Sequence, residues 1–291
     1  MKAKAVVLLL GFLAFGIVTE ARAAQRPRNG PWNNDLMIAE GSDPGVFGAA
    51  QTFVPRAGVP SVIHMGEGSL VAAFQWFPEN DEEHFDKVAV CFSEDYGKTW
   101  SEPISIDIAG FPPEMMRPFD PTLALLDDGK IRLYFTSGIR GPKMVPAIYS
   151  AVSAGGMHYT FETGQRLGVA GKRVIDSAVA RFKGQWHMTA PIGSPEQGAY
   201  HAVSEDGLNF TRLPNIPSSG GANWTGNLLV VDDAMRFYGG SPRELFWSET
   251  RDGHVWSKPG TISLTGGDPA AVAAGNEKYL LIFTGVPRRK N

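Results

Sequence analysis

A pair of short apolar strands joined by a tight turn recurs five times along this chain. Each copy opens on a small or acidic residue, turns at a Gly or an Asp, and continues into a second strand. Repeats spaced at about 40–60 residues are typical of propellers and solenoids, in which each repeat is buried against its neighbours. The copies open at Pro60, Asp120, Asp176, Asn227 and Asp268, and their second strands span 69–76, 130–137, 185–191, 234–239 and 277–285.

The first residues are typical of an exported protein. Lys2 and Lys4 precede an apolar run over 5–18, and 21–23 read Ala-Arg-Ala, an A-x-A cleavage site. We therefore expect a signal peptide over residues 1–23, cleaved near Ala23 and Ala24. The mature protein would be secreted or periplasmic and free of the membrane, with residues 24–291 forming one β-propeller domain.

Charge, cysteine content and motifs exclude several classes of protein. The formal net charge is −3, so the sequence offers no basic surface for nucleic acid. Cys91 is the only cysteine, which excludes an intrachain disulfide, and its apolar strand predicts a buried, inert thiol. Phosphate loops, nucleotide fingerprints and metal-ligand spacings are absent, so we expect no cofactor and no metal site. The oligomeric state stays open.

A second repeat runs in phase with the first. Its best copy is Ser-Glu-Asp-Tyr-Gly-Lys-Thr-Trp over 93–100, and related turns follow at 153–159, 204–210 and 248–256. In such a turn the Asp side chain accepts backbone N–H groups, and the Gly tolerates a positive φ. The repeat predicts a hairpin between the third and fourth strands of each unit.

These turns resemble the Asp box, S-x-D-x-G-x-x-W, of the sialidase-type (BNR repeat) propellers. The resemblance implies a propeller whose boxes lie away from the active site. Four blades of four strands can be counted, and a fifth has only the strands near 268–273 and 279–284. We expect the N-terminal segment, with strands near 36–40 and 49–54, to close the ring. The prediction is an all-β, five-bladed propeller; six blades are the alternative.

Three aspartates open inner strands and are the first candidates for catalysis. Asp120, Asp176 and Asp268 stand at the same place in three repeats, where they would face one central channel. Ser61 and Asn227 are the equivalent residues in the other two repeats. An Asp before Pro or Ser can simply cap a turn. Several carboxylates around one channel are unfavourable unless a function requires them, so we favour a catalytic role.

The arrangement is also similar to five-bladed glycosidases of the arabinanase, xylosidase and invertase type. That resemblance implies that Asp120 activates water and that Asp176 orients the sugar and tunes the acid. Where those families have a glutamate, this chain has Asn223-Trp224-Thr225-Gly226-Asn227, so Asn223 and Asn227 become candidate sugar ligands. Glu196 and Glu244 are the substitutes for the missing acid.

Arginines and tryptophans on the same face are candidates for substrate binding. Arg56 and Arg117 precede inner strands, where they could clamp a carboxylate or sulfate, and Arg243 lies in a loop on that face. Trp76 and Trp224 could stack on a sugar ring. Sialidases also need a tyrosine nucleophile, and no tyrosine stands at a channel position in this sequence.

Three hypotheses follow for function. The leading one is a secreted glycoside hydrolase that acts on a glycan, acidic in one version, through inner-strand carboxylates. The second is a propeller that binds carbohydrate without catalysis. The third is a polysaccharide lyase, with a His or Tyr base and arginines that neutralise a uronate. All three have a carbohydrate as the partner, and the fold alone does not choose among them.

Overall fold

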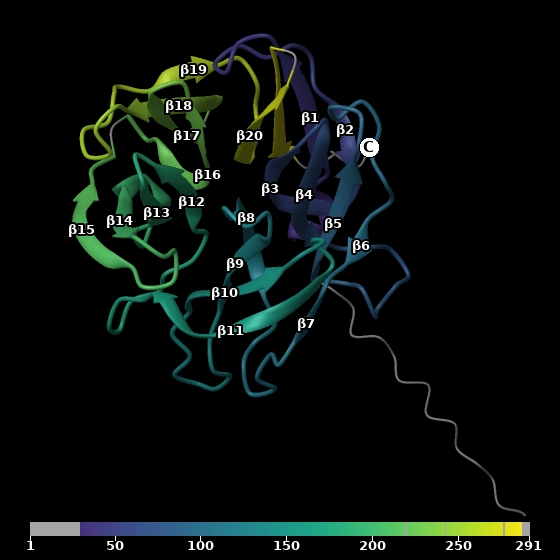
Figure 1. Ribbon diagram of the computed structural model, residues 1–291, viewed down its shortest axis with the longest axis vertical. Coiled ribbons are helices and arrows are strands. Elements are labelled where there is room, and N and C mark those ends of the chain that lie inside the picture. Colours follow the sequence, from purple (N-terminus) through teal and green to yellow (C-terminus); the bar gives the residue numbers. More distant parts are fainter. Residues whose placement is uncertain (1–29, 219, 242, 276, 287–291) are drawn as a thin grey trace, which may run out of the picture.

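Five β-sheets are arranged as blades around a central axis, with their innermost strands nearest the centre (Figure 1). The computed structural model describes residues 30–218, 220–241, 243–275 and 277–286. Four sheets have four strands, and the second has a fifth, short strand. The five-bladed prediction is confirmed. The predicted signal peptide and its cleavage site lie outside the described residues.

The strands follow the sequence repeats closely. From the inner to the outer edge, the first blade contains β3 (Ala57–Gly66), β4 (Ser69–Trp76), β5 (Lys87–Ser93) and β6 (Ile104–Ser105). The second contains β8 (Phe119–Leu125), β9 (Ile131–Ser137), β10 (Ala147–Ser153), β11 (His158–Leu167) and β7 (Asp107–Ala109). The third contains β12 (Ala178–Phe182), β13 (Gln185–Pro191), β14 (Ala199–Ser204) and β15 (Thr211–Ile216).

The fourth blade contains β16 (Asn223–Val231), β17 (Ala234–Gly240), β18 (Leu245–Thr250) and β19 (Gly260–Ile262). The fifth contains β20 (Gly267–Gly275), β21 (Lys278–Thr284), β1 (Leu36–Gly41) and β2 (Gln51–Val54). Two short 3-10 helices, η1 (Pro31–Asn33) and η2 (Pro195–Gln197), complete the described elements.

The fifth blade is assembled from both ends of the chain. β1 pairs with β21 in an antiparallel register that runs from Leu36 opposite Thr284 to Gly41 opposite Tyr279. β2 then pairs with β1 at the outer edge. The C-terminal strands thus have their missing partners, and the sheet has four strands like its neighbours.

Each seam between neighbouring blades is filled by its own hydrophobic cluster. Phe74 and Leu280 belong to the cluster between the first and fifth blades, and Phe135 to the one between the first and second. Met188 fills the next seam, and the last two clusters contain Phe237 and Phe283. A middle strand such as β9 is buried at every position because each of its faces meets another blade.

The serine- and threonine-led turns stabilise the end of the ring away from the inner-strand aspartates. Asp95 accepts the N–H groups of Lys98 and Thr99 at 3.0 and 2.9 Å, which holds its pKa at about 2. Asp206 and Asp252 accept two N–H groups each in the same way. These three carboxylates have structural roles in their turns.

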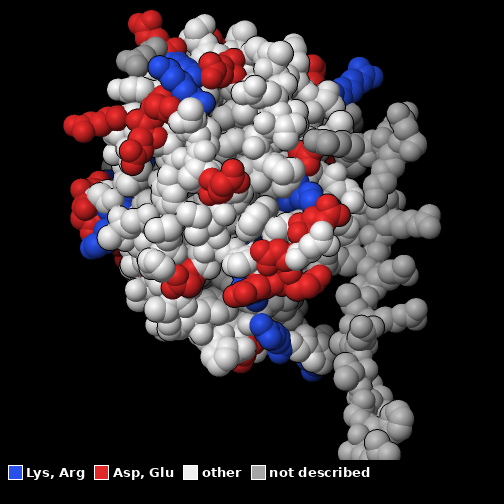
Figure 2. Space-filling view, turned by 90° about the vertical axis from the view of Figure 1, so that its right-hand side faces the viewer, with Lys and Arg blue, Asp and Glu red and all other residues white. Residues whose placement is uncertain are grey.

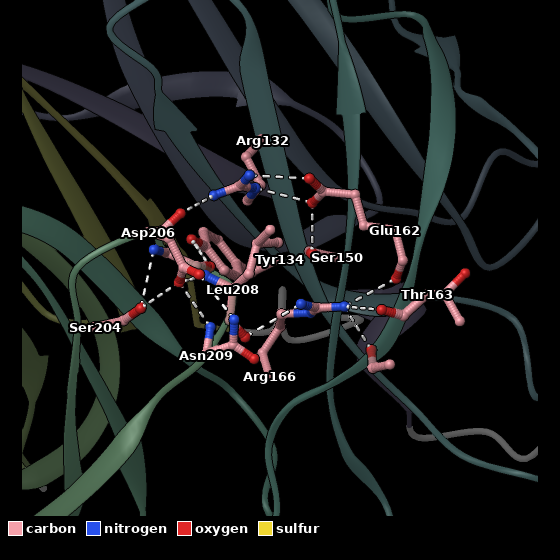
Figure 3. A network of polar contacts seen from close by, with 12 residues as sticks. Arg132, Tyr134, Ser150, Glu162, Thr163, Arg166, Ser204, Asp206, Leu208 and Asn209 are labelled. Carbon is pink, nitrogen blue, oxygen red and sulfur yellow. Dashed lines mark hydrogen bonds and ion pairs between the residues drawn. The ribbon is translucent and has the colours of Figure 1, made fainter.

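A buried network ties one such turn to the neighbouring blade (Figure 3). Arg132 contacts both carboxylate oxygens of Glu162, at 2.8 and 2.9 Å, and its Nη1 donates to the carbonyl of Asp206 at 3.0 Å. The Tyr134 hydroxyl donates to the carbonyl of Gly207 at 2.8 Å, and Arg166 donates to that of Leu208. The second and third blades are therefore joined by polar contacts as well as by packing.

The surface carries mixed charge. On the side that Figure 2 shows, Lys and Arg side chains are interspersed with Asp and Glu and form no continuous basic band. Cys91 is buried in the first blade, and burial raises the pKa of its thiol to about 12, as expected for an inert cysteine. None of the described helices is long and apolar enough to cross a membrane.

Candidate active site

The three predicted aspartates meet at the centre of the ring. Asp120, Asp176 and Asp268 adopt left-handed backbone conformations, with φ of 52°, 52° and 48°. Asp120 and Asp268 lie at register shifts near the starts of β8 and β20, and Asp176 lies just before β12. Asp tolerates this conformation better than most residues. All three line one small cavity of about 10 Å³, room for a single water at most.

The register of the first and fourth blades differs from the predicted one. Val59 (φ 51°), not Ser61, occupies the left-handed position in the first blade, and the hydroxyl of Ser61 instead accepts the N–H of Leu123 at 2.9 Å. In the fourth blade Thr225 and Gly226 lie at this level, and Thr225 is hydrogen-bonded to Asp268. Only three of the five blades therefore supply a carboxylate.

Threonines on the second strands hold the aspartates in place. Thr136 is hydrogen-bonded to the Asp120 carboxylate, and its Oγ1 accepts the N–H of Asp176 at 3.2 Å. Thr284 repeats this arrangement: its hydroxyl lies 3.4 Å from the Asp268 carboxylate, and it accepts the N–H of Val59 at 3.0 Å. Each threonine links one blade to the next.

Asp120 and Asp176 form a coupled pair. The carboxyl and the N–H of Asp176 are both hydrogen-bonded to the Asp120 carboxyl. Burial raises the pKa of Asp120 to about 6, and the nearby Asp268 acts in the same direction. Burial and the charges of Asp120 and Asp268 raise the pKa of Asp176 well above its ordinary value. Both carboxyl groups therefore keep their protons to a higher pH than an ordinary aspartate does.

An open cleft of about 610 Å³ lies above this pair. Asp120 lines both the cleft and the inner cavity, whereas Asp176 and Asp268 line only the cavity. Asp120 is thus the member of the pair that a bound molecule can reach. The other residues that line the cleft are Pro31, Gly58, Val59, Gln75, Phe77, Asp86, Met116, Arg117, Phe119, Met144, Pro146 and Arg173.

Two arginines, Arg117 and Arg173, line the cleft beside its two aspartates. Arg117 is half-buried, and burial together with the charge of Arg140 lowers its pKa, while Asp120 opposes that change. Arg173 is exposed, and its charge lowers the pKa of Asp176. Arg173 forms no hydrogen bond or salt bridge with any residue that the structure describes, so its guanidinium is available to an anionic ligand.

The remaining predicted site residues are divided between the cleft and other places. Arg117 lies in the cleft, and Asn227 lines the inner cavity, where its Oδ1 accepts the N–H of Leu228 at 3.1 Å. Arg56 stabilises the loop that follows β4, because its Nε donates to the carbonyl of Phe77 at 2.8 Å. Trp76 lies at the end of β4 and packs against the core and His84.

The fourth-blade residues have structural contacts. Trp224 is only 4% exposed and stacks on Phe237 with ring centroids 4.5 Å apart, so its ring is packed within the hydrophobic cluster between the third and fourth blades. Asn223 caps its own turn by accepting the N–H and hydroxyl of Thr225. Arg243 and Glu244 belong to the 241–244 turn, in which both N–H groups approach the hydroxyl of Ser241.

Glu196 does not supply the missing acid in this conformation. It lies in η2, is exposed, and interacts with the hydroxyl of Ser194, which lowers the pKa of its carboxyl. Glu196 and Glu244 are both absent from the residues that line the cleft and the cavity. Among the described residues, no group of three or more His, Cys, Asp or Glu side chains is arranged to hold a metal ion.

Three cleft residues were not predicted from the sequence. Gln75 is buried at the end of β4, Asp86 ends the loop that follows, and Arg173 precedes the inner strand of the third blade. Asp86 and Arg173 are charged residues outside the strands, and nothing in the local sequence pattern distinguishes them from other such residues. Their register beside the inner strands becomes visible only in the folded ring.

Comparison with solved structures gives the same architecture. The GH32 β-fructofuranosidase BmSUC1 of Bombyx mori aligns with a TM-score of 0.60 at 14% sequence identity, over 90% of this chain and 60% of that chain. The GH43_1 enzyme of Xanthomonas citri, solved with xylotriose, aligns with a TM-score of 0.58 at 13% identity, over 78% and 81%.

The Hadza microbial sialidase Hz136 aligns with a TM-score of 0.52 at 14% identity, over 86% of this chain and 59% of that chain. No protein-family model matches the sequence, and no curated protein sequence matches it. At these identities the comparison concerns the fold. The chain has the five-bladed propeller architecture on which glycoside hydrolases with very different sequences are also built.

Proposed function

We propose that this protein is a glycoside hydrolase that acts on an acidic glycan in the cleft above Asp120. The observation that carries the proposal is the coupled pair Asp120–Asp176, buried beneath an open cleft of about 610 Å³ and in contact with it through Asp120 alone. Buried carboxyl groups with raised pKa values are costly, and they are typical of catalytic sites. The glycosidases among the structural neighbours support the same reaction class.

In this proposal Asp120 is the proton donor. Its raised pKa keeps a proton available up to about pH 6, and Asp176 can donate a hydrogen bond to the carboxylate that remains after transfer. The resemblance to known families implied the opposite role, the activation of water. Burial and negative neighbours favour the donor role because they stabilise the protonated form. Asp268, behind the pair, raises the pKa of both without reaching the cleft.

The arginines support an acidic substrate. Arg173 and Arg117 line the cleft, and Arg140 lies near enough to affect Arg117. A uronate or sulfate group could pair with Arg173 in a bidentate contact. Phe77 and Phe119 provide apolar surface in the same cleft. With the predicted signal peptide, we propose that the protein meets this glycan outside the cytoplasm.

A binding-only propeller remains the second candidate because of one observation. Two-carboxylate glycosidases separate their acids by about 5–5.5 Å in retaining enzymes and about 6.5–9.5 Å in inverting ones. Asp120 and Asp176 are hydrogen-bonded to each other, so together they do not form such a pair. A hydrolase therefore needs a second carboxylate in the cleft.

Turnover of a panel of uronate- and sulfate-bearing oligosaccharides, followed by release of reducing ends, tests this function. We expect the wild-type protein to cleave at least one member and Asp120→Asn to lose at least about 100-fold in kcat. Arg173→Met should raise KM for the acidic substrate and leave KM for its carboxyl-reduced analogue unchanged. Binding without cleavage across the panel would favour the binding-only propeller.

A further inference from the structure

The first blade departs from the repeat in a way that points to an unassigned group. Val59 holds the left-handed conformation (φ 51°) that Asp120, Asp176 and Asp268 adopt in their blades. A β-branched residue is strained there, so the backbone of the repeat persists although the carboxylate is missing. The inner strand of the first blade thus contributes no acid to the centre.

A carboxylate from another part of that blade reaches the cleft instead. Asp86 ends the loop after β4, and its N–H donates to the carbonyl of Trp76 at 2.8 Å, which fixes the residue beside the end of that strand. Asp86 and Asp120 are the two acidic residues among those that line the cleft. Both can therefore face the same bound molecule.

Arg117 and Gln75 hold the Asp86 carboxylate from two sides. Arg117 Nη2 forms an ion pair with Asp86 Oδ2, and Arg117 Nε donates to the Asp86 carbonyl at 2.6 Å. Gln75 Nε2 donates to Asp86 Oδ1 at 2.9 Å. The side chain of Asp86 is still 32% exposed, so one face remains open to the cleft. The neutral amide of Gln75 on Oδ1 and the charged guanidinium of Arg117 on Oδ2 together orient the carboxylate.

Gln75 supplies an independent sign that a ligand belongs here. The residue is only 5% exposed, and its Oε1 is buried without a hydrogen-bond partner among the described residues. Since Nε2 is directed to the Asp86 carboxylate, Oε1 must be the atom left free. A buried acceptor without a partner is costly unless a bound molecule supplies a donor. The hydroxyl of a sugar, or the protonated Asp120, could do so.

Register places Gln75 between the two carboxyl groups. In three blades, a residue on the second strand pairs with the residue immediately before the left-handed position of the inner strand. These pairs are Gln75 with Gly58, Thr136 with Phe119, and Thr284 with Gly267. Thr136 and Thr284 each accept the N–H of the left-handed residue in the next blade. The equivalent neighbour of Gln75 is Asp120, so Asp86, Gln75 and Asp120 follow one another along the floor of the cleft.

We propose that Asp86 is the second carboxylate of the active site and acts as its general base. This inference rests on the proposed function. Asp86 takes a proton from water while the water oxygen bonds to the anomeric carbon. The glycosidic C–O bond breaks, and Asp120 gives its proton to the departing oxygen. One water is consumed, and the proton on Asp86 returns to Asp120 through solvent. A charged carboxylate opposite a protonated one is the division of roles that such a reaction needs.

The test compares Asp86→Ala and Asp120→Asn on two substrates, a natural-type glycoside and an aryl glycoside with a strongly acidic leaving group. Asp86→Ala should lose at least about 100-fold in kcat on both, because water is no longer activated. Sodium azide should restore its activity and yield a glycosyl azide, since azide needs no base. Asp120→Asn should lose activity on the natural-type glycoside and keep most of it on the aryl glycoside, which needs no proton donor.

Asp81→Ala is the matched control. Asp81 lies in the same loop, is 38% exposed, and pairs with His84, yet it does not line the cleft. Its activity should equal that of the wild type. Asp86→Ala activity within a few-fold of the wild type, or a folded Asp86→Ala variant that azide does not restore, would overturn the assignment. If the wild type cleaves no glycoside, the proposed function itself fails, and the role of Asp86 fails with it.

Discussion

Replacing Asp120 by Asn should stabilise the fold at neutral pH while it removes activity. The Asp120 carboxyl is buried beside Asp176 and Asp268, and its pKa rises from 3.8 to about 6 on folding. A group with a raised folded pKa binds its proton more tightly in the folded state. Its contribution to stability is therefore complete below pH 3.8 and is lost as the pH rises through 6.

The size of the effect follows from that difference in pKa. One pKa unit corresponds to about 1.4 kcal/mol, so ionisation of Asp120 above pH 7 costs the folded state about 3 kcal/mol. An Asn side chain cannot ionise and can still accept from Thr136 or the N–H of Asp176. We expect Asp120→Asn to gain about 2–3 kcal/mol in the free energy of unfolding at pH 7.5, or roughly 5–10 °C in Tm.

Denaturant unfolding of both proteins between pH 4 and pH 8 measures this gain. The advantage of Asp120→Asn should shrink as the pH falls and disappear near pH 4. Asp233→Asn, an exposed carboxylate paired with Arg251, is the control and should differ little from the wild type at any pH. A variant that is less stable than the wild type at pH 7.5, or a gain that does not depend on pH, would refute the reasoning.

Three further predictions concern the pH profile, a histidine pair and the core. The kcat/KM of the wild type should fall as the pH rises through about 6. Asp268→Asn should shift this fall to lower pH, because the charge of Asp268 raises the pKa of Asp120. A pH profile that does not shift would show that Asp268 has no part in setting the pKa of Asp120. Burial lowers the pKa of both His187 and His201 to about 4. The free energy of unfolding should therefore fall between pH 6.5 and pH 4, on the order of 1–3 kcal/mol per histidine. A His187→Phe/His201→Leu variant should lose this pH dependence in a urea titration. Trp224→Ala should destabilise the fold by about 3–5 kcal/mol in the same assay; intact stability with lost glycan binding would instead show that Trp224 is a sugar platform.

The architecture was predictable because the repeat constrains it locally. Each Asp-Gly turn and each pair of apolar strands can be recognised from its local sequence, and all five copies predict the same two-strand unit. Asp120, Asp176 and Asp268 could be brought together from sequence alone, since they stand at the same step of a repeat that surrounds an axis. The coupling between Asp120 and Asp176 depends on their burial, which the sequence alone does not reveal.

The rest of the site could not be predicted, for physical reasons. Val59 preserves the backbone of the repeat without the carboxylate, so a comparison by residue type selected Ser61 in its place. Asp86 can be assigned to the site only from its contacts with Gln75 and with Arg117, which precedes the inner strand of the second blade. Trp224, in a glycine-rich segment, reads as exposed from its neighbours but fills the seam beside Phe237. Long-range packing decides each of these cases.

The central claim is that a glycan is hydrolysed in the cleft above Asp120. Incubation of the wild type and Asp120→Asn with acidic oligosaccharides in heavy-oxygen water, followed by mass spectrometry, tests it most directly. Wild-type products should carry one heavy oxygen at the new reducing end, and Asp120→Asn should give no such products. Unsaturated products without heavy oxygen would indicate a lyase. Equal hydrolysis by both proteins, or none by either, would contradict the account.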